Sequence, residues 1–179
     1  IIVMAMAMLP ILSVGGMQLF RTEAFDTPDK VVPRAAQLAG GIFAIYMFMT
    51  GVCAVALWTT GLPGFDAITH AMTTIATGGY STKDNSIGYF NNPAAEWIII
   101  AGMIIGSLPF LYYLRVVRGN VSPIIKDSQV KWFLAVVILS VLAVAPWVWG
   151  GPNTGIEATI RDIAFNVISI LTGTGYTTQ

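Results

Sequence analysis

Long stretches without charged side chains alternate with short polar segments along this chain. Residues 37–60 contain no charge over 24 positions, which is enough for a helix of about 36 Å that crosses a bilayer. Three other apolar stretches are residues 1–20, 97–114 and 132–149. The polar segments between them are residues 21–36 and 119–131. The pattern therefore predicts an all-α membrane protein.

A further segment, residues 66–76, has a helical pattern but is too short to cross a membrane. Eleven residues extend about 17 Å, against about 30 Å of hydrocarbon. The next residues, 77–81, are Thr-Gly-Gly-Tyr-Ser and form helices poorly. Irregular backbone at membrane depth occurs only inside protein or beside a water-filled path. This segment therefore predicts a half-helix, or pore helix, and a turn that lines a pore or substrate path.

The same pattern recurs 96 positions later, with a pore helix expected at residues 157–171 and a turn at 172–177. The two copies align without gaps, and four identical pairs are Asp66 and Asp162, Gly79 and Gly175, Tyr80 and Tyr176, and Thr82 and Thr178. Repetition of a pore helix together with its turn indicates one structural unit used more than once.

The distribution of basic residues predicts the orientation. Seven of the nine Lys and Arg residues lie in segments 21–36 and 115–131, which the positive-inside rule places in the cytoplasm. Both glycine turns then open outward in a multi-pass plasma-membrane protein. One complete repeat covers residues 37–118, with a second span at 97–114 that should kink at Pro109. Residues 1–20 end the preceding repeat, and residues 132–179 form the first half of the next one.

Composition narrows the class of protein. The 179 residues are 55% hydrophobic and 10% charged, with zero net charge, which does not fit an ordinary soluble domain or a nucleic-acid-binding surface. The single cysteine, Cys53, lies in an apolar stretch and is expected to be a small buried residue. The chain has one histidine and no nucleophile–base pair, so we do not expect an enzyme.

The turns themselves are suited to a cation. Backbone carbonyls replace the water shell of a monovalent ion without a fixed charge that would hold the ion too tightly. Glycine allows the unusual backbone angles that direct carbonyls into a pore. The expected filter backbone is Thr77, Gly78, Gly79, Tyr80, Gly173, Thr174, Gly175 and Tyr176, with the ion at residues 77–79 and 173–175. The neutral turns favour K⁺ or Na⁺ over Ca²⁺, which prefers carboxylates, and no organic cofactor is expected.

Several side chains near the turns have expected roles. Asp66 and Asp162 are interpreted as N-terminal caps of the pore helices, and the side chains of Tyr80 and Tyr176 as packing behind the filter. His70 is expected to be a hydrogen-bonded packing residue. Glu96 is interpreted as a solvated residue at the membrane interface. Gly102 and Gly106, four residues apart, should allow a neighbouring helix to approach closely.

Three segments resemble one known family. Residues 74–82 (TIATGGYST) with 84–90 (DNSIGYF) are similar to the second pore loop of the TrkH/TrkG/KtrB superfamily of potassium transporters, and residues 172–178 (TGTGYTT) to the third. Residues 15–20 (GGMQLF) are similar to the end of the first repeat's second helix.

The resemblance implies four helix–pore-loop–helix repeats around one pore, with parts of three in this chain. The first and fourth filter strands are then expected outside this sequence, which is interpreted as an internal fragment. The family's key filter glycine falls on Gly79 and Gly175, whereas Ser81 and Thr177 replace the last glycine of the potassium-channel filter. The resemblance further implies a bacterial inner membrane, contact with lipid, a homodimer and a cytoplasmic nucleotide-binding regulatory ring.

Two alternatives to a pore remain open from the sequence. An alternating-access secondary cation transporter with re-entrant hairpins predicts inverted repeats, whereas the charge distribution gives both units the same orientation. A non-conducting membrane scaffold is the other alternative, and it requires the repeated glycines to serve packing alone.

Overall fold

The computed structural model describes residues 34–117, 127–148 and 155–178. The expectations for residues 1–20, and most of those for segments 21–36 and 119–131, lie outside the described residues. The chain divides into two compact units, residues 1–45 and 46–179. The second unit contains both glycine turns.

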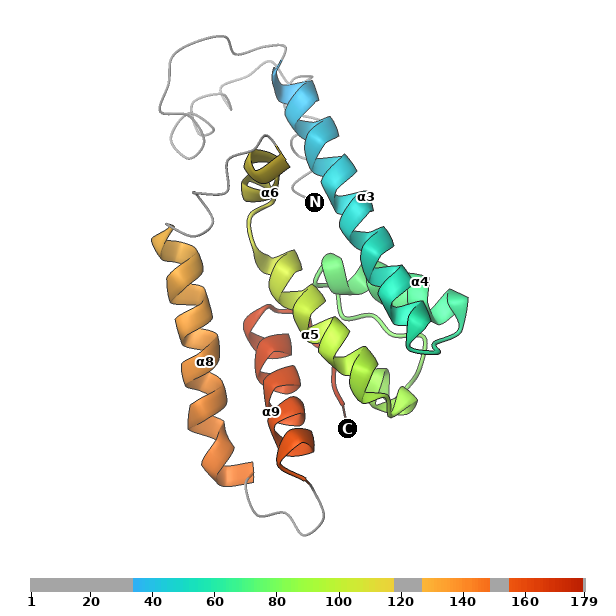
Figure 1. The fold of residues 1–179 in the computed structure, drawn as a ribbon, viewed down its shortest axis with the longest axis vertical. Helices are drawn as coiled ribbons and strands as arrows, with labels where there is room; N and C mark the ends of the chain where they lie inside the picture. The colour runs from blue at the N-terminus through green and yellow to red at the C-terminus, as the bar shows by residue number, and fades with distance from the viewer. Residues whose placement is uncertain (1–33, 118–126, 149–154, 179) are drawn as a thin grey trace. The chain divides into compact units, whose positions relative to one another are not determined.

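The described residues form helices and connecting turns, without a strand (Figure 1). The α-helices are α3 (Arg34–Thr59), α4 (Gly64–Ile75), α5 (Pro93–Ser107), α6 (Phe110–Val117), α8 (Ser128–Val148) and α9 (Ile156–Leu171). A short 3₁₀ helix, η1 (Ser86–Phe90), follows the first turn. Helices α3 and α8 contain stretches long and apolar enough to cross a membrane, whereas α4 and α9 are the two helices that lead into the glycine turns.

The stretch 97–114, expected as one span, is divided between α5 and α6. Leu108 has an extended backbone, with φ −78° and ψ 148°, because the ring of Pro109 disfavours helical angles in the residue before it. The hydroxyl of Tyr113 donates to the carbonyl of Ile105 at 2.6 Å, which connects the two helices across the break.

The expectation that Asp66 and Asp162 cap the pore helices is wrong. Helix α4 begins at Gly64 after Pro63, and α9 begins at Ile156 after Gly155. Neither N-terminus has a side-chain cap. Both aspartates therefore lie inside their helices. Asp66 instead accepts a hydrogen bond of 2.6 Å from the Thr82 hydroxyl and lies 3.6 Å from the Lys83 ammonium, although it still faces the favourable positive end of α4.

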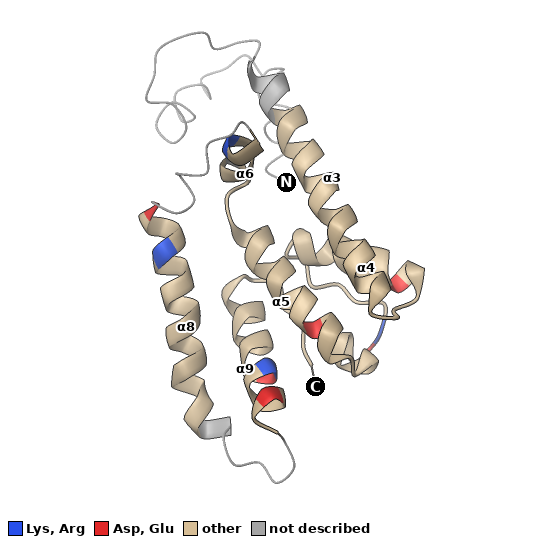
Figure 2. Ribbon diagram, in the orientation of Figure 1, with Lys and Arg blue, Asp and Glu red and all other residues tan. Residues whose placement is uncertain are grey.

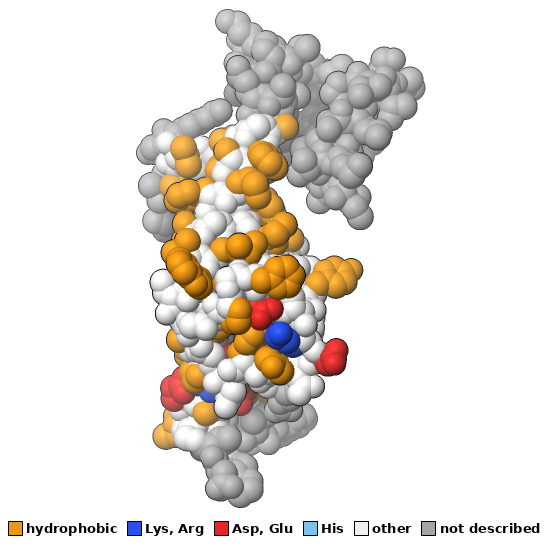
Figure 3. Space-filling model, turned by 90° about the vertical axis from the view of Figure 1, so that its right-hand side faces the viewer, with side chains coloured by type: hydrophobic (Ala, Val, Ile, Leu, Met, Phe, Trp, Pro, Cys, Tyr) orange, Lys and Arg blue, Asp and Glu red, His pale blue; other side chains and the backbone are white. Residues whose placement is uncertain are grey.

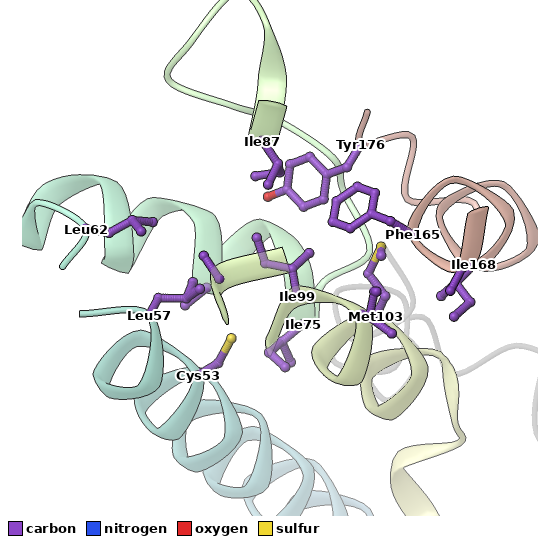
Figure 4. Close-up of a cluster of buried hydrophobic side chains, with 14 of the residues drawn as sticks. Cys53, Leu57, Leu62, Ile75, Ile87, Ile99, Met103, Phe165, Ile168 and Tyr176 are labelled. Atoms are coloured by element: carbon purple, nitrogen blue, oxygen red, sulfur yellow. The ribbon is translucent and has the colours of Figure 1, made fainter. Parts of the chain in front are cut away.

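The core of the second unit forms where α5 packs against α4 and α9, while α8 packs against α9. Figure 4 shows side chains from several elements meeting there, among them Leu57 of α3, Ile99 and Met103 of α5, and Phe165 of α9. Tyr176, from the second turn, belongs to the same cluster. The core therefore fixes the second turn as well as the helices.

Helix α5 approaches α4 through its two glycines, as their spacing predicts. A Cβ atom on Gly106 would lie 2.6 Å from the carbonyl oxygen of Ile75, and one on Gly102 would lie 2.7 Å from Cγ2 of Thr74. These distances leave no room for a side chain. The end of α4 that leads into the first turn is thus held directly against the backbone of α5.

The surface has the character of a membrane protein. Large apolar side chains are exposed along α8, for example Trp132, Leu139 and Leu142, and Figure 3 shows apolar side chains spread over one face of the molecule. Charged side chains lie near helix ends, including Lys131 in the first turn of α8 and Glu157 in the first turn of α9 (Figure 2). This distribution fits helices in contact with lipid.

Candidate functional site

The two turns, residues 77–81 (the first turn) and 172–177 (the second turn), leave their helices in the same way. The amide of Gly78 donates to the carbonyl of Thr73 at 2.7 Å, and the amide of Thr174 donates to the carbonyl of Ser169 at 2.9 Å. These residues are equivalent under the 96-residue offset. The repeat seen in the sequence therefore extends to individual backbone hydrogen bonds.

The backbone angles of the turns repeat as well. Positive φ values occur at Thr77 (48°) and Gly173 (70°), and again at Gly79 (68°) and Gly175 (87°). Glycine tolerates this left-handed region, whereas a β-branched residue such as Thr77 is strained there. Left-handed residues directly after a helix reverse the chain, so each turn runs back beside the pore helix that precedes it.

A hydroxyl on each pore helix holds the tyrosine of its own turn. Thr73 Oγ1 donates to the Tyr80 carbonyl at 2.9 Å, and Ser169 Oγ donates to the Tyr176 carbonyl at 2.8 Å. Both tyrosine carbonyls therefore face their helices. The expected filter backbone includes both tyrosines, but their carbonyl oxygens accept hydrogen bonds from hydroxyls of the protein itself.

The two turns lie directly against each other. A Cβ atom on Gly79 would lie 1.9 Å from the carbonyl oxygen of Thr174, so only glycine fits at this position. The Tyr176 hydroxyl bonds to Thr73 Oγ1 and lies 3.3 Å from each of the carbonyl oxygens of His70 and Tyr80. Tyr176 is buried, whereas Tyr80 is 79% exposed. The expected packing role thus applies to Tyr176 and not to Tyr80 within the described residues.

His70 is buried behind the first turn and is hydrogen-bonded, as expected. Its Nδ1 lies 2.7 Å from the Asp66 carbonyl oxygen, and its Nε2 lies 2.9 Å from Ser81 Oγ. A carbonyl can only accept, so Nδ1 carries the proton, and in the neutral ring Nε2 accepts from the serine hydroxyl. The side chain therefore links the pore helix to the end of the first turn.

The interpretation of Glu96 as a solvated residue is wrong, because it is 5% exposed. Arg161 Nε donates to Glu96 Oε2 at 2.6 Å, which joins α9 to α5. Arg161 also donates to both carboxylate oxygens of Glu157, and Trp97 Nε1 donates to Glu157 Oε1 at 3.1 Å. The hydrogen bond from Arg161, followed by that from Trp97, holds the pKa of Glu157 below its ordinary value.

Sequence reasoning overlooked Arg161 as a structural residue. The available signal was its position inside a pore helix expected at membrane depth, where an unpaired guanidinium is costly. Its buried partner, Glu96, is 65 residues away along the chain, so this pairing was not visible in the local pattern.

The groups in the two turns that could bind an ion are backbone carbonyl oxygens and side-chain hydroxyls. Neither turn contains an Asp, Glu, Lys or Arg residue. Among the residues that the structure describes, no three His, Cys, Asp or Glu side chains group together to hold a metal ion. The chemistry available at the turns is therefore coordination by neutral oxygens, aided by the negative C-terminal ends of α4 and α9.

Comparisons with known proteins point to one family. Residues 1–148 match the TrkH family, described as cation transport protein. The Trk system potassium uptake protein TrkI of Halomonas elongata is 40% identical over 177 residues, which cover 98% of this chain and 36% of that protein. The Trk system potassium uptake protein TrkH of Salmonella typhimurium is 37% identical over 183 residues, or 100% of this chain and 38% of that protein.

The fold matches as well. The crystal structure of the potassium transporter TrkH from Vibrio parahaemolyticus aligns with a TM-score of 0.80 at 33% identity, covering 100% of this chain and 36% of that one. The expected all-α fold is thereby confirmed. The chain spans just over a third of the length of these relatives. Because the family match covers most of its residues, the chain belongs to the TrkH family of cation transport proteins.

Proposed function

We propose that this chain is part of the pore-forming subunit of a potassium uptake system in the bacterial plasma membrane. The observation that carries the proposal is the direct contact between two equivalent turns, in which Gly79 lies against the Thr174 carbonyl. Two relatives that align with 98% and 100% of this chain are named Trk system potassium uptake proteins. A pore needs filter strands that meet at one axis, and the contact between the turns supports this arrangement.

The ion is the transported substrate. The carbonyls of residues 77–79 and 173–175 are the proposed ligands, and turns outside this chain complete the coordination shell. Carbonyl dipoles bind a weakly hydrated monovalent cation and still release it, which favours K⁺ or Na⁺. Partial negative charge at the C-terminal ends of α4 and α9 lowers the energy of a cation beside the turns.

The topology and partners belong to the same proposal. Segments 21–36 and 115–131 face the cytoplasm, and both turns open to the outside. The domain boundaries follow, with a complete repeat at residues 37–118 and half a repeat at 132–179. Family resemblance supports a homodimer and a cytoplasmic nucleotide-binding regulatory ring as partners.

Substitution of Gly79 by Ala in the full-length protein tests the proposal. The added methyl group cannot coexist with the Thr174 carbonyl, and a left-handed alanine costs about 1–2 kcal/mol more. We expect K⁺ uptake by a K⁺-uptake-deficient strain to fall at least about tenfold, the effect of roughly 1.4 kcal/mol on a barrier.

Gly51→Ala is the matched control, because Gly51 lies in α3 and a Cβ there meets nothing within 4 Å. Uptake by this variant should equal that of the wild type. If Gly79→Ala reaches the membrane in normal amount and transports K⁺ at the wild-type rate, the turns do not form the ion path.

A further inference from the structure

Two side-chain links fasten each turn to its pore helix: an inner link to the tyrosine carbonyl and an outer link to a hydroxyl after the tyrosine. The residue that makes the outer link differs between the two repeats. The inner link is the hydroxyl-to-tyrosine-carbonyl bond made by Thr73 and Ser169. At the outer link the first repeat has His70, and the equivalent position 96 residues later is Asn166. Both side chains bond to their own helix and to the segment that follows the tyrosine.

The two outer links are built alike at the pore helix but differ by one residue at the turn, because Ser81 is equivalent to Thr177 and not to Thr178. His70 Nδ1 lies 2.7 Å from the carbonyl of Asp66, and Asn166 Nδ2 donates to the equivalent carbonyl, that of Asp162, at 2.9 Å. The other contact is with a hydroxyl at the end of the first turn, His70 Nε2 to Ser81 Oγ at 2.9 Å, and just after the second turn, Asn166 Nδ2 to Thr178 Oγ1 at 3.0 Å. Both side chains therefore tie the hydroxyl-bearing residues after the tyrosine to the middle of the pore helix.

We propose that His70 and Asn166 are positioning residues that set the spacing of the filter carbonyls and thereby the preference among monovalent cations. The inference rests on the proposed function. Neither side chain contacts the ion path directly; each acts through the strand that follows its tyrosine. Ion preference depends on the placement of the carbonyl dipoles, and a strand fastened at two points keeps those carbonyls at a fixed distance from the pore helix.

The repeat supplies a decisive pair of substitutions. Leucine resembles histidine in volume but cannot form either hydrogen bond, whereas asparagine is smaller but, at position 166, bonds to the equivalent carbonyl and to a hydroxyl one residue further along the chain. If His70 only fills space, His70→Leu is mild and His70→Asn is harmful because it leaves a cavity. If His70 positions the strand, His70→Leu is the harmful substitution and His70→Asn is the mild one.

The experiment measures initial rates of K⁺ and Na⁺ uptake by the full-length protein in proteoliposomes. For His70→Leu we expect the ratio of K⁺ to Na⁺ uptake to fall about fivefold, the effect of roughly one hydrogen bond. His70→Asn should recover most of the lost discrimination. Met72→Leu is the control, since it changes a side chain of similar size on the same helix, and Met72 is 46% exposed.

A second variant covers the case in which His70→Leu does not fold. Ser81→Ala removes the other partner of the outer link without altering the pore helix, and it should lower the same ratio in the same direction. An unchanged ratio in Ser81→Ala, or a His70→Asn variant less selective than His70→Leu, would overturn the inference. Wild-type protein without K⁺ uptake above empty liposomes would instead refute the proposed function, so the two failures are distinguishable.

Discussion

At the scale of single residues, the buried contact between Arg161 and Glu96 joins the second pore helix to α5. The two side chains are nearly enclosed, with exposed fractions of 10% and 6%. A buried pair adds little over an apolar pair of the same shape, but loss of one partner leaves the other charge without compensation. Removal of one of the two charges should therefore destabilise the protein much more than replacement of both by apolar residues.

Glu96→Ala in the full-length protein should destabilise the folded state by about 3 kcal/mol, because it leaves the Arg161 guanidinium buried with less compensation. Thermal unfolding in detergent measures the effect as a lower midpoint. The double variant Glu96→Leu with Arg161→Met removes both charges and should recover much of the loss. Glu157→Gln is the control, because Glu157 is 64% exposed and solvent screens its interaction. Equal midpoints for Glu96→Ala and Glu157→Gln would show that burial of the pair is unimportant.

Residue-level predictions from the sequence succeeded where the information is local. The glycines of the turns, the buried Cys53 and the hydrogen-bonded His70 follow from short patterns. Glu96 was misread because its environment depends on a residue in another repeat. Asp66 was misread because helix α4 begins two residues earlier, after Pro63, which leaves the carboxylate free to bind Thr82 instead of capping the helix.

At the scale of elements, α5 is the support on which the first turn is built. Its glycine face lies against the last residues of α4, with Gly106 beside the Ile75 carbonyl. The contact is with backbone, which cannot rotate away as a side chain can. A change of one methyl group on α5 is therefore transmitted to the residue at the end of α4, just before the first turn.

Gly106→Ala should lower both the unfolding midpoint and the rate of K⁺ uptake, since the methyl group would lie 2.6 Å from the Ile75 oxygen and overpacking costs about 1–3 kcal/mol. Gly51→Ala makes the same chemical change in α3 without a neighbour, and its greater helix propensity should keep the midpoint equal or slightly higher. The expected result is thus different for two identical substitutions. A Gly106→Ala protein at least as stable as Gly51→Ala would contradict the close packing.

Element boundaries were partly accessible to sequence reasoning. The spacing of Gly102 and Gly106 predicted a close helix contact correctly, but it did not identify α4 as the partner. The kink expected at Pro109 is a full break, since Leu108 leaves the helical region before the proline. Periodicity cannot show this, because the apolar pattern continues through Pro109.

At the scale of the whole molecule, the contacts of Tyr176 run from one repeat to the repeat before it. Its hydroxyl reaches back to the pore helix of the preceding repeat, where it meets Thr73 and the carbonyl of His70. Tyr80 is its equivalent one repeat earlier and is 79% exposed in the described structure. This chain covers just over a third of its relatives' length, so a full-length protein of that size has room for a preceding repeat that covers Tyr80.

If Tyr80 contacts a preceding pore helix as Tyr176 does, the contact would bury its ring. We therefore expect Tyr80 to be shielded in the full-length protein. The test replaces Cys53, the one cysteine in this chain, by Ala and introduces Tyr80→Cys or Tyr89→Cys. Tyr89 is the control, since it is 61% exposed on η1 and lies outside both turns. A thiol reagent added from outside should modify position 89 readily and position 80 slowly. Equal rates at the two positions would show that Tyr80 does not dock as Tyr176 does, and that the repeats do not close into a ring by this contact.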